Sequence, residues 1–287
     1  MEQALAEAAR GDVVVKASGV GVLDAHLEAA VAALKRPGLT TIFWDVDAPA
    51  TLQRLRDDPR DPFRALIPRY DLVLTYGGGD PVVAAYAAFG ARHCVPIYNA
   101  LDPLTHFRVP PDRRFAADLA LLANRLPDRE ARVEEFFLRP AALLPDRRFL
   151  LGGNGWADKP LPSNVDYVGH VYTRDHNAVN STMQAVLNVS RDSMASMGFS
   201  PATRVFEAAG AGACLISDAW EGMELFLEPD REVLAARDGD EVAAHLAALT
   251  PERARRIGEA ARRRVLAHHT YAARVRLLES VLEGCPA

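Results

Sequence analysis

Ten short apolar runs, each followed by a helix-like or loop segment, constrain the fold of this chain more than any other feature. A run that is continuously apolar, rather than alternating with polar residues, is typical of a strand buried on both faces. Their repetition predicts parallel sheets covered by helices, an α/β fold. Four runs lie at 12–18, 40–47, 72–77 and 94–100, and six at 118–124, 149–153, 165–168, 185–189, 214–218 and 233–236.

The stretch between the fourth and fifth runs differs in composition from the sequence on either side. Residues 101–116 are rich in Pro, Asp and Arg, with Pro110 and Pro111 adjacent. Such a composition is typical of a linker. A chain of 287 residues is also long enough for two domains of about 100–200 residues each. The sequence therefore predicts two successive α/β domains joined by this segment.

Charge and hydropathy argue against several classes of function. The formal net charge is −5, and the 33 Lys and Arg residues are dispersed among 38 Asp and Glu residues. This balance argues against binding to a nucleic-acid backbone. No apolar run approaches the roughly 20 residues of a membrane span, and residues 1–10 predict an Ala/Glu-rich helix rather than a signal peptide. We therefore expect a cytoplasmic protein.

The cysteines give no sign of a disulfide framework or a zinc site. Cys94, Cys214 and Cys285 are odd in number and form no C-x-x-C pair, and two of them lie within predicted strands. The His, Asp and Glu residues do not show the spacing of metal ligands either. We therefore expect no metal.

The stretch around Ser200 predicts an anion site at the start of a helix. Ser200 is a typical N-cap and Pro201 a typical first helical residue. Thr203, Arg204 and Glu207 would then share one face of the first two turns, near free backbone N–H groups and the positive end of the helix dipole. The alternative is an ordinary capped helix with a surface pair between Arg204 and Glu207.

Polar residues follow several predicted strands, and ligands of open parallel sheets bind where the strands end. In the first domain these residues are Asp45, Asp47, the glycines at 77–79 and, just beyond the fourth strand, His106. In the second domain they are Asn124, Arg125, Arg129, Asn154, Trp156 and His170. Arginine suits a diphosphate, which its planar fork binds through two hydrogen bonds. A turn, a helix cap or a loop charge would explain each feature singly, so the predicted site rests on their co-location.

Motifs spread over nearly the whole chain carry a family resemblance. In the C-terminal half they are RVFEAAGAG at 204–212, LISDAWEG at 215–222 and RRVLAHHTY at 263–271. Upstream they are WDVDAPATL at 44–52, YGGG at 76–79, NRLPDR at 124–129 and GH at 169–170. Together they resemble the GT-B glycosyltransferases, with the greatest similarity to the CgeB-like (spore maturation protein) family.

The resemblance implies two Rossmann-like parallel-sheet domains. They would be an acceptor-side domain over 1–110 and a nucleotide-sugar-binding domain over 111–270, with a helix over 271–287 that crosses back to the first domain. The resemblance also implies a nucleotide-diphospho-sugar donor, with UDP favoured, and no further cofactor. By motif position, Glu207 would accept hydrogen bonds from ribose hydroxyls. Arg125 and Arg129 would contact the diphosphate, and we expect Asn154, Ser200, Thr203 and Arg204 to complete the nucleotide site.

Two features depart from the family pattern. Retaining members with paired glutamates carry the first glutamate eight positions before the second, and Phe199 occupies that position here. The family also usually opens with a strand and a glycine-rich loop. This chain opens with a predicted helix that leads into what resembles the second strand, so we expect its N-terminal domain to lack the first β-α unit.

Glycosyl transfer needs a base for the acceptor if the reaction inverts, or a stabilised leaving diphosphate if it retains. The base candidates are Asp45, Asp47 and His106, expected on the N-terminal side of the cleft. His170 would contact phosphate or sugar, or else be a buried structural histidine. Trp156 would stack on the base or sugar, or else pack in the core.

Three functions follow from these observations. The first is a hexosyltransferase-type glycosyltransferase that uses a nucleotide sugar. The second is a catalytically silent GT-B module that binds a nucleotide or a partner protein, which Phe199 and the missing first unit favour. The third is a nucleotide-sugar epimerase, disfavoured because carboxylates for proton abstraction are not evident.

Overall fold

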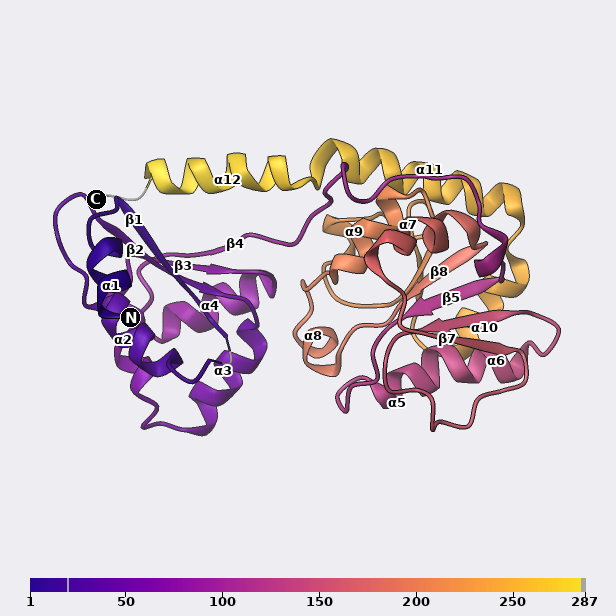
Figure 1. The fold of residues 1–287 in the computed structure, drawn as a ribbon, viewed down its shortest axis with the longest axis horizontal. Coiled ribbons are helices and arrows are strands. Elements are labelled where there is room, and N and C mark those ends of the chain that lie inside the picture. The colour runs from indigo at the N-terminus through magenta and orange to yellow at the C-terminus, as the bar shows by residue number, and fades with distance from the viewer. Residues whose placement is uncertain (20, 285–287) are drawn as a thin grey trace. The chain divides into compact units, whose positions relative to one another are not determined.

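The computed structural model describes residues 1–19 and 21–284 (Figure 1). These residues form two compact units. Unit 1 comprises Met1–Tyr98, the short segment Met197–Ser200 and the chain from Arg274 to the end of the last helix, and unit 2 comprises Asn99–Ser196 and Pro201–Ala273. Residues 99–110, expected in the N-terminal domain, belong to unit 2. Cys285 and the last residues of the expected terminal helix lie outside the described residues.

Unit 1 is built on a parallel four-stranded sheet in the order β1-β2-β3-β4. Val15 of β1 is in register with Ile42 of β2, which is in register with Leu72 of β3. All four strands predicted for this region are confirmed. The elements are α1 (Glu2–Ala8), β1 (Val13–Ala17), α2 (Asp24–Ala32), β2 (Thr40–Asp45), α3 (Ala48–Asp57), η1 (Pro62–Ala65), η2 (Ile67–Arg69), β3 (Leu72–Thr75), α4 (Gly79–Ala88) and β4 (Cys94–Pro96).

Both faces of this sheet are covered by apolar side chains. On one face, Phe43 packs with Leu52 of α3 and Tyr86 of α4 in a core of buried residues. On the other face, Ile42 packs with Leu278 and neighbouring residues of α12 (Tyr271–Gly284), the final helix. Burial on both faces explains why the inner strands β2 and β3 are continuously apolar. The edge strand β1 is buried on one face only, and its Val13 and Val15 are exposed.

Unit 2 contains a parallel six-stranded sheet in the order β10-β9-β8-β5-β6-β7. The six strands predicted for it are confirmed within a residue or two at each end. They are β5 (Leu119–Leu122), β6 (Phe149–Gly152), β7 (Val165–Gly169), β8 (Ala185–Asn188), β9 (Leu215–Asp218) and β10 (Leu234–Ala236). The order of the strands reverses between β5 and β8, and ligands of open α/β sheets bind beside such a reversal, at the carboxyl ends of the strands.

The helices of unit 2 pack around a core that includes Phe137, Phe149 and Trp156. They are η3 (Arg113–Phe115), α5 (Glu130–Val133), the π-helical turn η4 (Glu134–Leu138), α6 (Arg139–Leu143), α7 (Thr173–Thr182), α8 (Asp192–Met197), α9 (Thr203–Gly210), η5 (Met223–Leu225), α10 (Gly239–Ala248) and α11 (Pro251–His268). No helix in the described part of the chain is long and apolar enough to span a bilayer.

The segment expected to be a linker is hydrogen-bonded along α7. Three side chains of α7 accept bonds from its backbone: Asn177 Oδ1 from Phe107 N at 3.2 Å, Ser181 Oγ from Val109 N at 3.1 Å, and Thr182 Oγ1 from Asp112 N at 2.8 Å. Residues four apart on a helix share a face, so α7 offers a row of acceptors to an extended backbone. The Pro-, Asp- and Arg-rich composition predicted a linker here but did not reveal this attachment or the short helix η3 (Arg113–Phe115) at its end.

Helix α9 begins later than predicted. Its first residue is Thr203 and its N-cap is Ala202, which has an extended backbone. Ser200 was expected to cap the helix, but its hydroxyl donates to Gly198 O at 2.8 Å instead. A Ser-Pro pair also suits an extended segment, because proline fixes only its own φ angle. The predicted start was therefore wrong by two residues, and Thr203, Arg204 and Glu207 lie in the first two turns as expected.

Candidate functional site

A cavity of about 280 Å³ lies at the carboxyl ends of β5, β6 and β7 in unit 2. Asn124, Gly153 and His170 line it from the loops that follow these three strands. Arg129, His176 and Arg204 line it from the N-terminal parts of α5, α7 and α9. We call this cavity the strand-end pocket. Four of the predicted site residues or motifs therefore meet there, at the place where the parallel sheet predicted a ligand.

Glycine at position 153 brings the floor of the pocket close to β5. Its φ is +131°, and a Cβ there would lie 2.1 Å from the carbonyl oxygen of Ala123. Only glycine fits such a contact. The same carbonyl accepts a hydrogen bond from Trp156 Nε1 at 2.7 Å, which fixes the loop after β6 against the end of β5.

The pocket holds guanidinium groups with unused hydrogen-bond donors. Nε of Arg129 and one terminal nitrogen of Arg204 are buried and have no hydrogen-bond partner among the described residues. Burial lowers the pKa of Arg129, with Asp128 partly offsetting it, and burial lowers the pKa of Arg204, with Glu207 partly offsetting it. Arginine nevertheless stays charged in proteins. Two desolvated cations with free donors form a site suited to an anion.

His176 is a wall residue that the sequence did not single out. Its Nε2 lies 3.2 Å from the carbonyl oxygen of Val171, and its Nδ1 is buried without a partner in the described part of the chain. Burial, followed by the charge of Arg204, lowers the pKa of the imidazole. The His176 side chain therefore favours its neutral form, in which the free ring nitrogen can donate a hydrogen bond to a ligand or accept one from it. Only its position, in the first turns of the helix after β7, signalled a role.

Glu207 is held by two neighbours beside the pocket. One carboxylate oxygen lies 3.6 Å from Nε2 of His106, and the other lies 3.8 Å from Arg204. The side chains of Arg204 and Glu207 are only 17% and 16% exposed, so they are not an ordinary surface pair. His106 was expected on the N-terminal side, but it belongs to unit 2. The reason is the attachment of its segment to α7.

Two predicted nucleotide contacts are engaged elsewhere. Arg125 does not line the strand-end pocket, because its guanidinium pairs with Glu130 at 2.7 Å and with Asp158 at 3.0 Å. Trp156 is 0% exposed and packs in the core of unit 2, so it is not available to stack on a base or sugar. The sequence could not separate these residues from true wall residues, because Asp158 and the carbonyl of Ala123, which hold Arg125 and Trp156, each lie 33 residues away along the chain.

Of the remaining predicted contacts, His170 lines the pocket, and Asn154, Thr203 and Ser200 do not. The backbone N–H of Asn154 donates to Asn124 Oδ1 at 2.9 Å, which orients a wall residue. His170 is exposed, and the centroid of its ring lies 4.7 Å from that of Tyr172 in an edge-on arrangement. It is therefore not the buried structural histidine of the alternative interpretation. Thr203 is exposed at the start of α9, and Ser200 is buried in unit 1.

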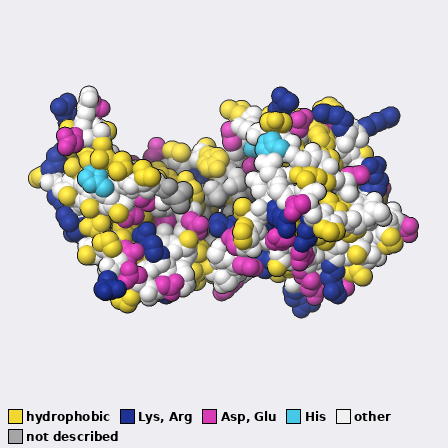
Figure 2. All heavy atoms as spheres, turned by 60° about the horizontal axis from the view of Figure 1, so that its bottom comes forward, with side chains coloured by type: hydrophobic (Ala, Val, Ile, Leu, Met, Phe, Trp, Pro, Cys, Tyr) yellow, Lys and Arg dark blue, Asp and Glu magenta, His cyan; other side chains and the backbone are white. Residues whose placement is uncertain are grey.

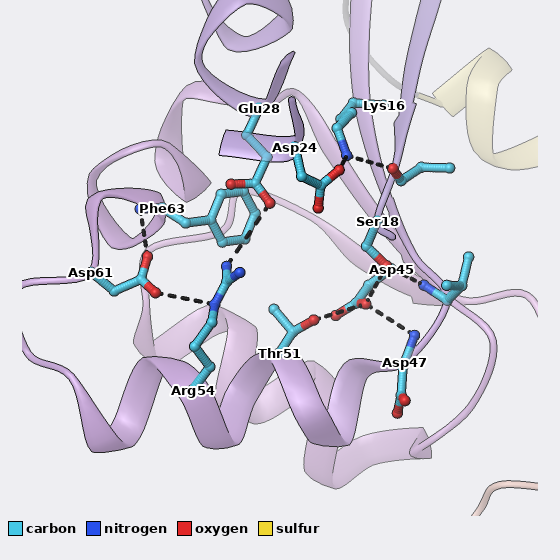
Figure 3. Close-up of polar contacts among 12 residues, drawn as sticks. Lys16, Ser18, Asp24, Glu28, Asp45, Asp47, Thr51, Arg54, Asp61 and Phe63 are labelled. Carbon is cyan, nitrogen blue, oxygen red and sulfur yellow. Dashed lines mark hydrogen bonds and ion pairs between the residues drawn. The ribbon is translucent and has the colours of Figure 1, made fainter. Parts of the chain in front are cut away.

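In unit 1, Asp45 is the centre of a buried hydrogen-bond network (Figure 3). The carboxylate is 0% exposed. It accepts bonds from Ser18 Oγ at 2.8 Å, Asp47 N at 3.1 Å, Thr51 Oγ1 at 3.0 Å and Tyr86 OH at 2.5 Å. Burial raises the pKa of Asp45, and these donors partly offset the effect. Asp45 therefore fixes the turn from β2 into α3, and its carboxylate is not accessible to an acceptor substrate.

Asp47 occupies a different position, although it is only two residues away. It is the N-cap residue of α3, and its side chain makes no capping hydrogen bond. It is half-buried, and its backbone N–H donates to Asp45. Of the two carboxylates predicted from this motif, Asp47 is therefore the more exposed one.

The glycine run at 77–79 accommodates another part of the chain. Gly78 N donates to the carbonyl oxygen of Phe199 at 2.8 Å, and a Cβ on Gly79 would lie 2.7 Å from the Phe199 ring. Phe199 itself has a φ of +47°, an uncommon conformation for a residue with a side chain. Phe199, which stands where the family pattern has its first glutamate, is therefore packed within unit 1.

Comparisons with known proteins agree with this architecture. Residues 129–280 match the family model described as glycosyl transferase-like. A comparison with curated proteins finds no match.

Solved structures show the same fold at low sequence identity. Anabaena Alr3699/HepE, in complex with UDP-glucose, is 14% identical with a TM-score of 0.71, over 99% of this chain and 81% of that one. Sucrose-phosphate synthase from Thermosynechococcus elongatus is 14% identical with a TM-score of 0.70, over 99% and 76%. T4 phage BGT, in complex with its UDP-glucose substrate, is 13% identical with a TM-score of 0.63, over 96% and 82%.

Proposed function

Because the chain belongs to the glycosyl transferase-like family, we propose that it transfers a hexosyl group from a UDP-type sugar donor to a hydroxyl acceptor. The family and the GT-B architecture fix the class of protein. The donor, its position and the residues that act on it belong to the proposal. Two of the structurally similar proteins, Anabaena HepE and T4 phage BGT, are seen with UDP-glucose, which supports UDP as the nucleotide.

The observation that carries the proposal is the pair of buried guanidiniums in the strand-end pocket. Arg129 and Arg204 present N–H groups that have no hydrogen-bond partner among the described residues, although that nitrogen of Arg204 lies 3.8 Å from a carboxylate oxygen of Glu207. A diphosphate would satisfy these donors and would be attracted by both guanidinium groups. Negative charge grows on the diphosphate as its bond to the sugar breaks, so the same two residues would stabilise the leaving group during transfer.

The nucleoside would lie towards the start of α9, where Glu207 accepts hydrogen bonds from the ribose hydroxyls. His106 and Arg204 hold its carboxylate in place. Glu207 belongs to the motif RVFEAAGAG, on which the resemblance to the CgeB-like family rests, and we propose that the chain is a member of that subgroup.

In the reaction, the acceptor oxygen attacks the anomeric carbon, the bond from that carbon to the diphosphate oxygen breaks, and the acceptor proton passes to a base. We propose Asp47 for this role if the reaction inverts. Asp45 is excluded because four donors occupy its buried carboxylate. His106 is assigned instead to the orientation of Glu207.

The surface agrees with a small-molecule substrate rather than a polyanion. Figure 2 shows Lys and Arg side chains interspersed with Asp and Glu on the face that it presents. No extended single-sign field of the kind that binds nucleic acid is visible there.

The test is turnover of a donor panel. UDP-glucose, UDP-galactose and UDP-N-acetylglucosamine are incubated with the protein and a set of sugar and polyol acceptors, and released UDP is measured. We expect release that saturates with one donor and is lost in Arg129→Ala. Saturable binding of UDP with no turnover for any combination would contradict the transferase.

Saturable binding of UDP without turnover would favour a silent nucleotide-binding module. The observation behind this candidate is Phe199, which lies where paired-glutamate members carry a donor-contacting glutamate and which packs on Gly79. Replacing it by glutamate restores that pattern, so gain of turnover in Phe199→Glu would identify the wild type as the silent form.

A further inference from the structure

A second cavity in unit 2 lies at the opposite edge of the six-stranded sheet from the strand-end pocket. Its volume is about 470 Å³, and its lining includes the residues directly before three strands: Asp118 before β5, Gln184 before β8 and Cys214 before β9. The strands are parallel, so their starts and their ends lie at opposite edges. The two cavities share no lining residue. We call this second one the strand-start cavity.

Asn180 of α7 lines this cavity and has no hydrogen-bond partner. Its side chain is 1% exposed, and neither Nδ2 nor Oδ1 is paired within the described residues. Buried side-chain amides are nearly always hydrogen-bonded, and leaving both ends unpaired lowers stability. The amide offers two donors on nitrogen and an acceptor on oxygen, which is the set that a polyhydroxylated ligand can pair with.

Two arginines line the same cavity. Arg255 of α11 is exposed and forms no ion pair in the described part of the chain. Arg108 pairs with Glu259, and its guanidinium also lies 3.5 Å from the carbonyl oxygen of Gly212. Arg255 is therefore an uncompensated cation at the cavity, with a second guanidinium beside it.

The acidic group on this wall is already neutralised. Asp118 pairs with Arg147 at 2.9 Å and accepts a hydrogen bond from Arg148 N at 2.8 Å. The cavity is also lined by Pro251, the first residue of the 18-residue helix α11, so the positive end of a long helix dipole faces it. The charges that remain favour an anionic ligand.

We propose that the strand-start cavity binds a small phosphate ester of a polyol, such as a sugar phosphate. The phosphate lies against Arg255 and Arg108, and hydroxyl groups of the ligand pair with the amide of Asn180. The volume is within the range of about 300–1,000 Å³ typical of small-molecule sites. This site is separate from the donor pocket and does not depend on the transferase proposal.

Calorimetry on the full chain tests this site with glucose 6-phosphate as the probe, and with inorganic phosphate and glucose as separate arms. We expect saturable binding of glucose 6-phosphate that is tighter than binding of either fragment. Arg255→Ala should weaken it by about tenfold or more, the loss expected for one charge-assisted hydrogen bond. Arg256→Ala is the matched control, because Arg256 is exposed on the same helix but does not line the cavity, and it should leave the affinity within about twofold.

Asn180→Leu is the second variant, since it removes both unpaired amide atoms at nearly constant volume. It should fold with unchanged or higher thermal stability and lose binding of glucose 6-phosphate while keeping weak binding of phosphate. Arg129→Ala, which alters only the strand-end pocket, should leave binding of glucose 6-phosphate intact whether or not the protein is a transferase. The proposal is overturned by absence of saturable binding in the wild type, by equal losses in Arg255→Ala and Arg256→Ala, or by loss of binding in Arg129→Ala.

Discussion

His106 Nε2 lies 3.6 Å from the Oε1 atom of Glu207, within unit 2. The histidine comes from the segment attached to α7, and the glutamate from the second turn of α9. With Arg204 on its other oxygen at 3.8 Å, the Glu207 carboxylate is held between two basic side chains. This arrangement supports Glu207 as an oriented acceptor for a ribose.

The Glu207→Gln variant tests that role. Glutamine replaces one of the two acceptor oxygens by an NH₂ donor and removes the negative charge, so affinity for uridine should fall by about 1.5–3 kcal/mol, the usual range for bonds to a charged group. The free energy of unfolding should change by at most about 1 kcal/mol. Calorimetry with uridine and urea denaturation measure the two quantities. Glu259→Gln, which removes the pair with Arg108, is the control, and an unchanged uridine affinity in Glu207→Gln would assign Glu207 a purely structural role.

His176 should make stability depend on pH. Its pKa is lowered by burial in the folded protein, whereas in the unfolded chain it should titrate near about 6.5. The unfolded chain therefore binds more protons below this pH, so the contribution of His176 is present above about pH 6.5 and is lost as pH falls towards the lowered pKa. Urea unfolding at pH 7 and pH 5 should show a smaller loss of stability in His176→Gln than in the wild type. Equal losses in both proteins would refute the assignment.

Gly79 should be intolerant of a side chain because of Phe199. Alanine in the left-handed region costs about 1–2 kcal/mol by itself, and a Cβ at Gly79 would also lie 2.7 Å from the Phe199 ring. Gly90, with a φ of +87° and no contact closer than 3.5 Å, is the matched control within unit 1. Gly79→Ala should lose about 1–3 kcal/mol more than Gly90→Ala in urea unfolding.

A double-mutant cycle isolates the Phe199 contact. Adding Phe199→Ala to Gly79→Ala relieves the overlap, so the two losses should be less than additive. If the two losses of stability are strictly additive, the Phe199 ring is not the cause of the cost of a side chain at position 79.

The sequence predicted the strands well because burial on both faces leaves a continuous apolar run. It also placed Arg129 and Arg204 at the mouth of a strand-end site, since parallel topology alone brings strand ends and helix starts together. Arg125 and Trp156 show the limit of this reasoning. Their partners, Asp158 and the carbonyl of Ala123, are contacts of the folded loops, and no local pattern distinguishes a paired arginine from a free one.

Asp45 and Asp47 show the same limit of prediction from sequence, although they are only two residues apart. The motif predicted two carboxylates at a strand end, but only packing against Tyr86 and Thr51 decides that Asp45 is buried and bonded. Similarly, the glycines at 77–79 indicated a close approach, and the sequence did not reveal that the approaching group is Phe199 of a distant segment.

Calorimetry of UDP and uridine with Arg129→Ala tests whether Arg129 binds the diphosphate of the donor. Arg125→Ala is the control, since Arg125 is paired with Glu130 and Asp158 and lies outside the pocket. Arg129→Ala should weaken UDP by about 1.5–3 kcal/mol, roughly tenfold or more, and leave uridine nearly unchanged, while Arg125→Ala should alter neither affinity. Equal UDP affinity in the wild type and Arg129→Ala would contradict the assignment of the strand-end pocket as the donor site.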